Sequence, residues 1–509
     1  MILERISQVA HNNVAIEYTR TTTTETITYG ELIAQVKQLK NHLLENNIKS
    51  VALYCDNTPQ WIVIDLACQS ANIVFTPIPV FFSTKQIQHL LTNVKPDLLF
   101  FDSNFTENLS NERCTYTSFL SPLNELKSLK LSYNSAAEMP QETSKITFTS
   151  GSTGEPKGVC LSVENQLNVA DALVDKIAIN TPTHLSLLSF STLLENVAGL
   201  YAPLLAGGTI CIASSNVRGF NGAQLTDLKK LLSFISQSKP QTMILVPELL
   251  QVLLLAVSQG WHPPTELEFI AVGGSRVSTK LLNKANQAGL PVYQGYGLSE
   301  CASVVSINSK ASVKGSGVNQ WAGEVLPHLT PEVIEGELVL KGNAFLGYLN
   351  MPESWYPQQI YTGDLVTLHS KNIEINGRKK NILINSYGRN ISPEWPEAEL
   401  MASGIFQQVV VLGDSQPFCI ALLVTASTKV STGVLHQVLA QVNSSLPDYA
   451  QIRDFIQLKQ VMTINDGLFT TNGRPKRHAI AHHYALDIEQ VYAAQLDENN
   501  LHATAPKFG

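Results

Sequence analysis

The chain alternates short apolar runs with amphipathic segments of helical length, and this alternation limits the fold more than any other feature. Five segments near the start show it: VALYCD (51–56), PQWIVIDLACQSA (59–71), IVFTPIPV (73–80), TKQIQHLLTNV (84–94) and PDLLFFD (96–102). Strands that alternate with helices usually pair in parallel, because each helix returns the chain to the same edge of the sheet. The sequence therefore predicts an α/β protein with a mostly parallel sheet and helices on both faces.

The pattern of predicted strands and helices changes toward the C-terminus. From about Glu335 glycines punctuate short strands, and after Arg378 the pattern becomes that of a compact α+β unit. The best single cut lies between Gly377 and Arg378. We therefore expect a large N-terminal domain at 1–377, with parallel and mixed sheets flanked by helices, and a small α+β C-terminal domain at 378–509.

Composition excludes several kinds of partner. The 509 residues are 44% hydrophobic and 15% charged, which is typical of a globular protein with more than one domain. A formal net charge of -7 without any run of five basic residues argues against binding to nucleic acid or to an anionic membrane. Seven scattered cysteines without a CxxC pair indicate neither a disulfide framework nor a zinc site.

The sequence also carries no signal for a membrane. The N-terminal MILERISQVA has charges where a secretory segment needs an apolar run, and no uninterrupted stretch of about 18 apolar residues occurs. We therefore expect a cytoplasmic protein without stable membrane insertion.

The segment ITFTSGSTGEPKGV (146–159) leaves an apolar strand and enters a loop of glycines and hydroxyl residues. Glycines at 151, 154 and 158 allow successive backbone N–H groups to turn inward around an anion, and a lysine adds positive charge. The spacing differs from the common P-loop, because Pro156 is the fifth residue after Gly151. A flexible surface turn is the alternative to a triphosphate site. The candidate ligands are Thr149, Ser150, Gly151, Ser152, Thr153, Gly154 and Lys157.

Four further segments follow this loop in order. They are FIAVGGSRVSTKLLNKANQAGLPVYQGYGLSE (269–300), GELVLKGNAFLGYLN (336–350), YTGDL (361–365) and GRKKNILINSYGRNISPEWPE (377–397). Together with the loop they resemble the core motifs of the adenylate-forming superfamily, which comprises acyl-CoA synthetases, peptide-synthetase adenylation domains and beetle luciferases. The resemblance covers nearly the whole chain. The sequences of these segments are most similar to those of long-chain fatty acyl-CoA synthetases.

The resemblance implies an AMP-forming ligase that uses ATP and Mg2+. In the implied first step a small-molecule carboxylic acid is joined to AMP and pyrophosphate is released. In the second step the acyl group passes to a thiol, either of coenzyme A or of the phosphopantetheine arm of an acyl carrier protein. The small C-terminal domain is expected to rotate between the two steps about a hinge near Lys379.

The resemblance also assigns roles to residues at matching positions. Glu300 resembles the carboxylate that binds Mg2+, a cation that prefers hard oxygen ligands, and it stands beside Ser299. Asp364 resembles the acid that accepts hydrogen bonds from both ribose hydroxyls, and Arg378 resembles its partner. The segments that flank adenine in relatives match Gly273, Gly274, Ser275, Gly295, Tyr296 and Gly297. The alternatives are a surface acid for Glu300 and a purely structural turn for the glycines.

The nature of the acid is read from LSFSTLLENVAGL (188–200). Peptide-synthetase adenylation domains place an aspartate here to pair with the amino group of an amino acid, whereas this stretch holds only Glu195. We therefore expect a fatty acid rather than an α-amino acid. The apolar residues fit an acyl tunnel and a buried core equally well. Many relatives have histidine where this chain has Thr192.

A second departure concerns TTNGRPKRHAI (470–480), where relatives carry a lysine after the glycine that reaches the α-phosphate and the carboxylate of the acid. Arg474 stands at that position, and arginine keeps the charge but not the compact ammonium. Pro475 favours an extended path, so Arg474 and Lys476 are expected to face the same side. Three alternatives follow: Arg474 acts, Lys476 acts, or the protein binds nucleotide or performs only the thioester step. We predict an active ligase, with Thr149, Glu300 and one of these two cations as the catalytic residues.

Overall fold

The computed structural model describes residues 1–102, 105, 114–118, 123, 126–149, 156–221, 224–310, 321–387, 389–470 and 473–493, with only the backbone for 114–118, 149 and 224. The chain forms two compact units. The first contains residues 1–275, 283–362 and 367–374, and the second contains 276–282, 363–366 and the chain from 375 onward. Mixed helices and strands in both units confirm the predicted α/β class. The cut between Gly377 and Arg378 stays a prediction.

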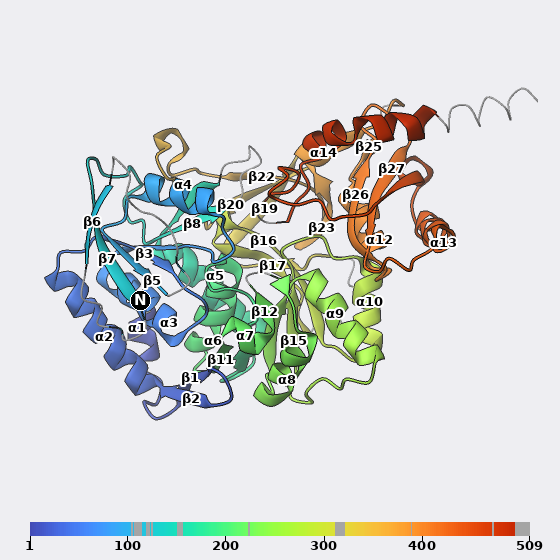
Figure 1. Cartoon of the computed structure of the whole chain (residues 1–509). Helices are drawn as coiled ribbons and strands as arrows, with labels where there is room; N and C mark the ends of the chain where they lie inside the picture. Colours follow the sequence, from blue (N-terminus) through green and yellow to red (C-terminus); the bar gives the residue numbers. More distant parts are fainter. Residues whose placement is uncertain are drawn as a thin grey trace, which may run out of the picture. The chain divides into compact units, whose positions relative to one another are not determined.

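The larger sheet is mixed and lies mainly in the first unit (Figure 1). Its core is parallel from β11 through β10, β14 and β15 to β16, after which β17 returns antiparallel. Its strand order is β19 (Leu329–Ile334), β20 (Glu337–Gly342), β22 (Ile360–His369), β23 (Asn372–Arg378), β18 (Glu324–Val325), β17 (Ser303–Ile307), β16 (Val292–Leu298), β15 (Phe269–Val272), β14 (Thr242–Leu245), β10 (Thr183–Leu185), β11 (Thr209–Ala213), β1 (Val14–Thr19) and β2 (Thr24–Thr28).

The second sheet of this unit carries the alternation seen at the start of the sequence. Its order is β21 (Gly347–Tyr348), β9 (Lys157–Leu161), β8 (Lys145–Thr149), β4 (Val74–Pro77), β3 (Ser50–Tyr54), β5 (Leu98–Phe101), β7 (Lys127–Tyr133) and β6 (Cys114–Ser118). Strands β8, β4, β3 and β5 pair in parallel. The crossover helices are α3 (Pro59–Ala71) and α4 (Thr84–Val94), as the periodicity predicts. Thr58 begins α3 by accepting a hydrogen bond from the Trp61 N–H.

The remaining elements of the first unit are mostly helices, of which α2 packs against α3 and α5 against α6. They are α1 (Ile2–Ile6), α2 (Tyr29–Glu45), α5 (Val163–Ile177), the π-helix η1 (Glu195–Tyr201), α6 (Ala202–Leu205), α7 (Ser215–Arg218), α8 (Leu228–Ser238), α9 (Pro247–Ser258), η2 (Ser299–Cys301), η3 (Pro352–Ser354) and the short strands β12 (Phe220–Asn221) and β13 (Gln224–Leu225). Helix α10 (Thr279–Gln287) is divided between the units. Among the described residues, none of the helices combines the length and the apolar character needed to span a bilayer.

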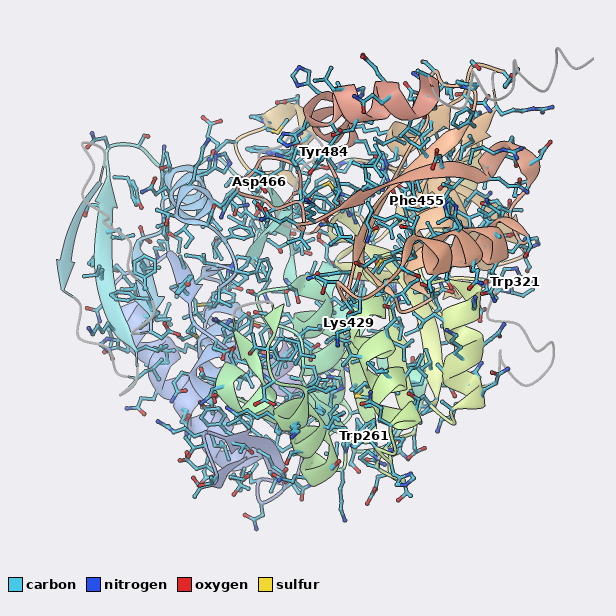
Figure 2. All side chains as sticks on the ribbon, turned by 45° about the vertical axis from the view of Figure 1, so that its right-hand side comes forward. Trp261, Trp321, Lys429, Phe455, Asp466 and Tyr484 are labelled. Atoms are coloured by element: carbon cyan, nitrogen blue, oxygen red, sulfur yellow. The ribbon has the colours of Figure 1, made fainter. Side chains whose placement is uncertain are left out.

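The second unit is built on a three-stranded sheet of β26 (Phe406–Leu412), β27 (Cys419–Thr425) and β28 (Ile452–Leu458). Successive strand residues point to opposite faces, so Val409 and Val411 join one apolar cluster and Val410 and Leu412 join another. The first cluster includes residues of α12 (Glu394–Met401) and α13 (Thr432–Asn443), with Phe455 packed against it (Figure 2). The second includes Ile480 of α14 (Arg477–His483). Short elements complete the unit: η4 (Lys379–Asn381), β24 (Leu383–Ile384), β25 (Asn390–Ile391) and η5 (Asp448–Ala450).

A buried ionic network joins β8, α3 and η1 in the first unit. The Lys145 ammonium lies 2.9 Å from Asp65 Oδ1, and both side chains are almost fully buried. Asp65 Oδ2 accepts hydrogen bonds from the Tyr201 hydroxyl at 2.7 Å and from Asn196 Nδ2 at 2.9 Å. Lys145 also donates to the Tyr201 hydroxyl and to Asn196 Oδ1. Burial lowers the pKa of Lys145, and the adjacent Asp65 carboxylate opposes that shift.

This network should be sensitive to the loss of one charge. Replacing Lys145 by methionine leaves Asp65 buried without its cation, and we expect the free energy of unfolding to fall by about 3–5 kcal/mol. The double variant Lys145→Met/Asp65→Asn removes both charges and should recover part of that loss. Urea unfolding of the three proteins, followed by circular dichroism, measures the effect. A double variant less stable than the single one would contradict the assigned pairing.

Candidate functional site

The anion loop predicted from the sequence connects two paired strands. Strands β8 and β9 are antiparallel, with Thr149 opposite Lys157, so the loop leaves and re-enters the sheet at one end of the hairpin. The Thr149 side chain and the predicted ligands Ser150, Gly151, Ser152, Thr153 and Gly154 lie outside the described residues. Lys157 is the first residue of β9. The carbonyl of the preceding Pro156 accepts a hydrogen bond from His89 Nε2 at 3.0 Å, which ties the end of the loop to α4.

Gly158 lies within β9, so the prediction that it belongs to the anion-binding turn is wrong. A Cβ atom at this position would lie 3.0 Å from Ile146 Cγ2 and 3.1 Å from Leu349 Cβ. The absence of a side chain therefore permits β8, β9 and β21 to pack closely. A loop glycine and a glycine under a tight strand contact cannot be distinguished in the sequence.

Tyr348 joins two of the predicted site residues, Lys157 and Glu300. It lies opposite Val159 in the antiparallel pair of β21 and β9, and Val159 shares one face of its strand with Lys157. The Lys157 ammonium is 5.2 Å from the centroid of the Tyr348 ring. The Tyr348 hydroxyl donates a hydrogen bond to Glu300 Oε1 at 2.9 Å. Burial and the Glu300 carboxylate raise the pKa of Tyr348, which keeps the hydroxyl protonated as a donor.

Glu300 has the chemistry of a magnesium ligand. It lies half-buried in η2, and its backbone carbonyl accepts a hydrogen bond from the Phe345 N–H at 2.8 Å. Within the described residues no group of three or more His, Cys, Asp and Glu side chains forms a candidate metal cluster. Magnesium usually takes only one or two protein carboxylates and keeps water and substrate phosphates as its other ligands. A single held carboxylate therefore fits this cation.

Of the glycines predicted to flank adenine, Gly273 and Gly274 follow the end of β15, whereas Gly295 and Gly297 lie within β16. A Cβ atom at Gly273 would lie 3.0 Å from the Gly295 carbonyl oxygen, and one at Gly297 would lie 1.7 Å from the Ser303 carbonyl oxygen. Gly274 has φ of +87°, which side chains rarely adopt. Backbone packing thus requires glycine at 297, the positive φ favours it at 274, and position 273 has little room for a side chain. A structural turn and a flat surface for a base are both compatible with this geometry.

The other residues predicted for this segment lie close by along the chain. Ser275 follows the turn after β15, and Tyr296 is half-buried at an irregularity in the pairing of β16 with β17. Ser299 begins η2 beside Glu300. Their roles toward a nucleotide stay predictions.

In the second unit, the structure brings Asp364 and Arg378 together. Arg378 Nε donates to Asp364 Oδ1 at 2.6 Å, and the Asp364 side chain is 7% exposed while that of Arg378 is 38% exposed. Asp364 comes from β22 and Arg378 ends β23. The pairing that the motif implies is therefore present, and the cation holds the carboxylate in one orientation.

Arg474 and Lys476 occupy different settings within the second unit. Arg474 is exposed, and its carbonyl accepts a hydrogen bond from the Thr470 N–H at 2.8 Å. Lys476 is half-buried at the N-cap of α14, and its N–H donates to the Leu468 carbonyl at 2.8 Å. The next residue, Arg477, binds Glu397 through two short contacts of 2.6 and 2.7 Å, an anchor that the sequence did not reveal. The start of α14 is thus anchored to α12.

Comparisons with known proteins agree with the fold and the motif order. A family model described as AMP-binding enzyme matches residues 3–349, and one described as AMP-binding enzyme C-terminal domain matches 380–496. The long-chain-fatty-acid–CoA ligase FadD15 of Mycobacterium bovis is 23% identical over 567 residues, which covers 92% of each chain. The D-alanine–D-alanyl carrier protein ligase of Staphylococcus haemolyticus is 25% identical over 498 residues, which covers 90% of this chain and 94% of that protein.

Solved structures show the same fold. The O-succinylbenzoate coenzyme A synthetase of Bacillus subtilis, in complex with ATP and a magnesium ion, superposes with a TM-score of 0.73 at 20% identity. The match covers 94% of this chain and 98% of that one. Because the first family model alone spans more than half of the sequence, the chain belongs to the AMP-binding enzymes of the adenylate-forming superfamily and is an AMP-forming acid–thiol ligase.

Proposed function

We propose that this ligase activates a fatty acid and transfers the acyl group to a thiol. In the first step a carboxylate oxygen attacks the α-phosphorus of ATP, and the bond from that phosphorus to the pyrophosphate breaks. In the second step a thiolate attacks the carbonyl carbon of the acyl-adenylate, and AMP leaves with the original carboxylate oxygen. The thiol belongs to coenzyme A or to a carrier protein's phosphopantetheine arm, and we place the reaction in the cytoplasm.

The residues of the first unit would stabilise the charge that develops on pyrophosphate. Lys157 would supply positive charge and the predicted loop before it N–H donors, and such groups act strongly where water is excluded. Glu300 would hold magnesium, which when bound neutralises charge on the phosphate oxygens. In the second unit Asp364, held by Arg378, would accept hydrogen bonds from the ribose hydroxyls.

The observation that carries the choice of a fatty acid is the state of Glu195. Its carboxyl is fully buried, and Oε1 lies 3.2 Å from Nε2 of the buried His184, whose Nδ1 is 2.9 Å from Thr242 Oγ1. Gly199 allows this approach, since a Cβ there would lie 2.5 Å from Glu195 Oε1. Oε1 is thus engaged inside the protein, and the full burial of the side chain argues against its pairing with the amino group of an amino acid.

The segment that holds Glu195 also contains apolar residues, although Asn196 beside it belongs to the buried ionic network. Phe190, Leu193, Val197 and Leu200 are all buried. An apolar acyl chain needs such surroundings, whereas a charged substrate group would lose its hydration there without compensation. The relative from Mycobacterium bovis carries the name of a long-chain fatty acid ligase, which supports the same substrate class.

A product assay tests this function. With ATP, magnesium and a series of fatty acids, the protein should form AMP and pyrophosphate, and addition of either coenzyme A or a phosphopantetheinylated carrier protein should yield a thioester. Amino acids and aromatic acids are tested as alternative substrates in separate reactions. Chromatography of the nucleotides and mass spectrometry of the thioesters report the result. Formation of ADP, or activity restricted to amino or aromatic acids, would contradict the proposal.

Lys157 offers a test of the phosphate site. We expect Lys157→Ala to lower kcat/KM for ATP by at least about tenfold, because a charge-assisted hydrogen bond to phosphate contributes about 1.5–3 kcal/mol. The melting temperature should change little, because the lysine lies at the edge of a hairpin and makes no ion pair among the described residues. Unchanged ATP kinetics would assign the loop to a structural turn.

Variants of Arg474 and Lys476 distinguish an active ligase from a rival function, in which the protein performs only the thioester step. We expect Arg474→Ala to slow adenylation by at least about tenfold, about 1.4 kcal/mol in the barrier, and Arg474→Lys to preserve or raise the rate. Lys476→Ala should matter less. Thioester formation from preformed acyl-adenylate should survive all three changes, since this position serves only the first step in relatives.

The opposite pattern of rates would reassign the role. Loss of adenylation in Lys476→Ala but not in Arg474→Ala would assign the charge to Lys476. A wild-type protein that turns over acyl-adenylate but does not make it would be a partial ligase, the rival function. Pyrophosphate release for the first step and thioester formation for the second, measured separately, distinguish these cases.

A further inference from the structure

Tyr348 is the one side chain for which the structure gives contacts to both Lys157 and Glu300 within the described residues. We propose that Tyr348 is a positioning residue, which holds the magnesium carboxylate and the phosphate-loop lysine in place and keeps them apart. This inference rests on the roles proposed above for Lys157 and Glu300. Tyrosine suits the task because its hydroxyl and its ring face make different kinds of contact.

The hydroxyl contact orients the carboxylate. Glu300 Oε1 accepts the hydrogen bond from Tyr348 at 2.9 Å, and a carboxylate has about four lone-pair positions on its two oxygens. One hydrogen bond restrains the rotation of the group and leaves acceptor capacity for a cation. The Phe345 N–H holds the backbone carbonyl of Glu300 as well, so one short segment fixes this residue through both its backbone and its side chain.

The ring contact holds the lysine. The distance of 5.2 Å between the Lys157 ammonium and the ring centroid is within the range of a cation–π interaction. No direct ion pair joins Lys157 to Glu300 in the part of the chain that the structure describes. If the two charges paired, the lysine would be less available to phosphate and the carboxylate to magnesium. Tyr348 makes one weak contact with each of these two groups. Both charges therefore stay available to a nucleotide and its metal.

The backbone of Tyr348 is itself held firmly. Its N–H donates to Ser354 Oγ at 2.8 Å, and its carbonyl accepts from Trp355 Nε1 at 3.0 Å. The Phe345 ring packs against the Tyr348 ring with centroids 4.8 Å apart. A residue that positions others must have its own rotamer fixed by its surroundings, and Tyr348 meets this condition.

Two substitutions separate the two contacts. Tyr348→Phe removes the hydroxyl and keeps the ring, whereas Tyr348→Leu removes both. Tyr356→Phe is the matched control, because the Tyr356 hydroxyl accepts a hydrogen bond from the Gln141 N–H at 2.8 Å and has no contact with either charged residue among the described side chains. Calorimetry should measure ATP binding with magnesium and with EDTA. Pyrophosphate release should be measured as a function of magnesium concentration, and melting temperatures should be recorded.

The inference predicts a distinct pattern for each variant. Tyr348→Phe should raise the magnesium concentration for half-maximal activity by about tenfold and leave ATP affinity in EDTA unchanged, as expected for one hydrogen bond to a charged group. Tyr348→Leu should in addition weaken ATP binding in EDTA by about fivefold, through loss of the cation–π contact. A merely structural tyrosine would lower the melting temperature without changing the magnesium requirement, and that result would overturn the inference.

Failure of the inference and failure of the proposed function give different results. If wild-type protein forms AMP from fatty acids and Glu300→Gln changes the magnesium requirement while Tyr348→Phe does not, only the role of Tyr348 is wrong. If the wild type forms no AMP, the proposed function is wrong, and the calorimetric comparison of Tyr348→Phe with Tyr356→Phe still tests the positioning role. Equal magnesium-dependent ATP affinities in those two variants would then overturn it.

Discussion

The antiparallel pairing of β8, β9 and β21 is the constraint on which the candidate site depends. This pairing brings Lys157 and Tyr348 together from distant parts of the sequence, because the hairpin of β8 and β9 receives β21 along its edge. Tyr348 reaches Lys157 only in the observed register, since a shift by one residue would turn its side chain to the other face of the sheet. Gly158 permits this close packing, and Glu300 is then held through Tyr348.

A buried ionic network holds the start of the hairpin in place. Lys145, at the start of β8, forms a buried ion pair with Asp65, and Asn196 and Tyr201 of the π-helix share the same network. Such networks cost desolvation, and their partners must all be present. Strand β8, which leads into the proposed phosphate loop, is thereby connected to the helix that begins at Glu195. The proposed nucleotide and acid segments of the first unit thus share one polar core.

Local sequence patterns predict the class of the fold, because the spacing of apolar residues that distinguishes a strand from a helix involves only residues close together in the chain. The helices at 59–71 and 84–94 coincide with their predicted ranges. The motif order identified the superfamily, and the structure brings Asp364 and Arg378 together as the motifs imply. Glu300 lies in the short helix that closes its motif, with one carboxylate oxygen already engaged.

Contacts between distant segments could not be predicted in the same way. Tyr348 stands in a quoted motif, but nothing in its neighbours along the chain indicates the bond to Glu300 or the contact with Lys157. The pairing of His184 with Glu195 likewise depends on the tertiary fold. The choice between Arg474 and Lys476 depends on side-chain placement relative to substrate, which a pattern of residue types does not contain.

In the proposed reaction a carboxylate oxygen becomes bonded to the α-phosphorus of ATP, and an isotope experiment tests this step most directly. A fatty acid labelled with oxygen-18 in its carboxyl group would be converted to thioester in a single turnover, and the nucleotide product examined by mass spectrometry. The account predicts one oxygen-18 atom in AMP and none in pyrophosphate. Label found in inorganic phosphate with ADP as the product, or AMP without any label, would contradict it.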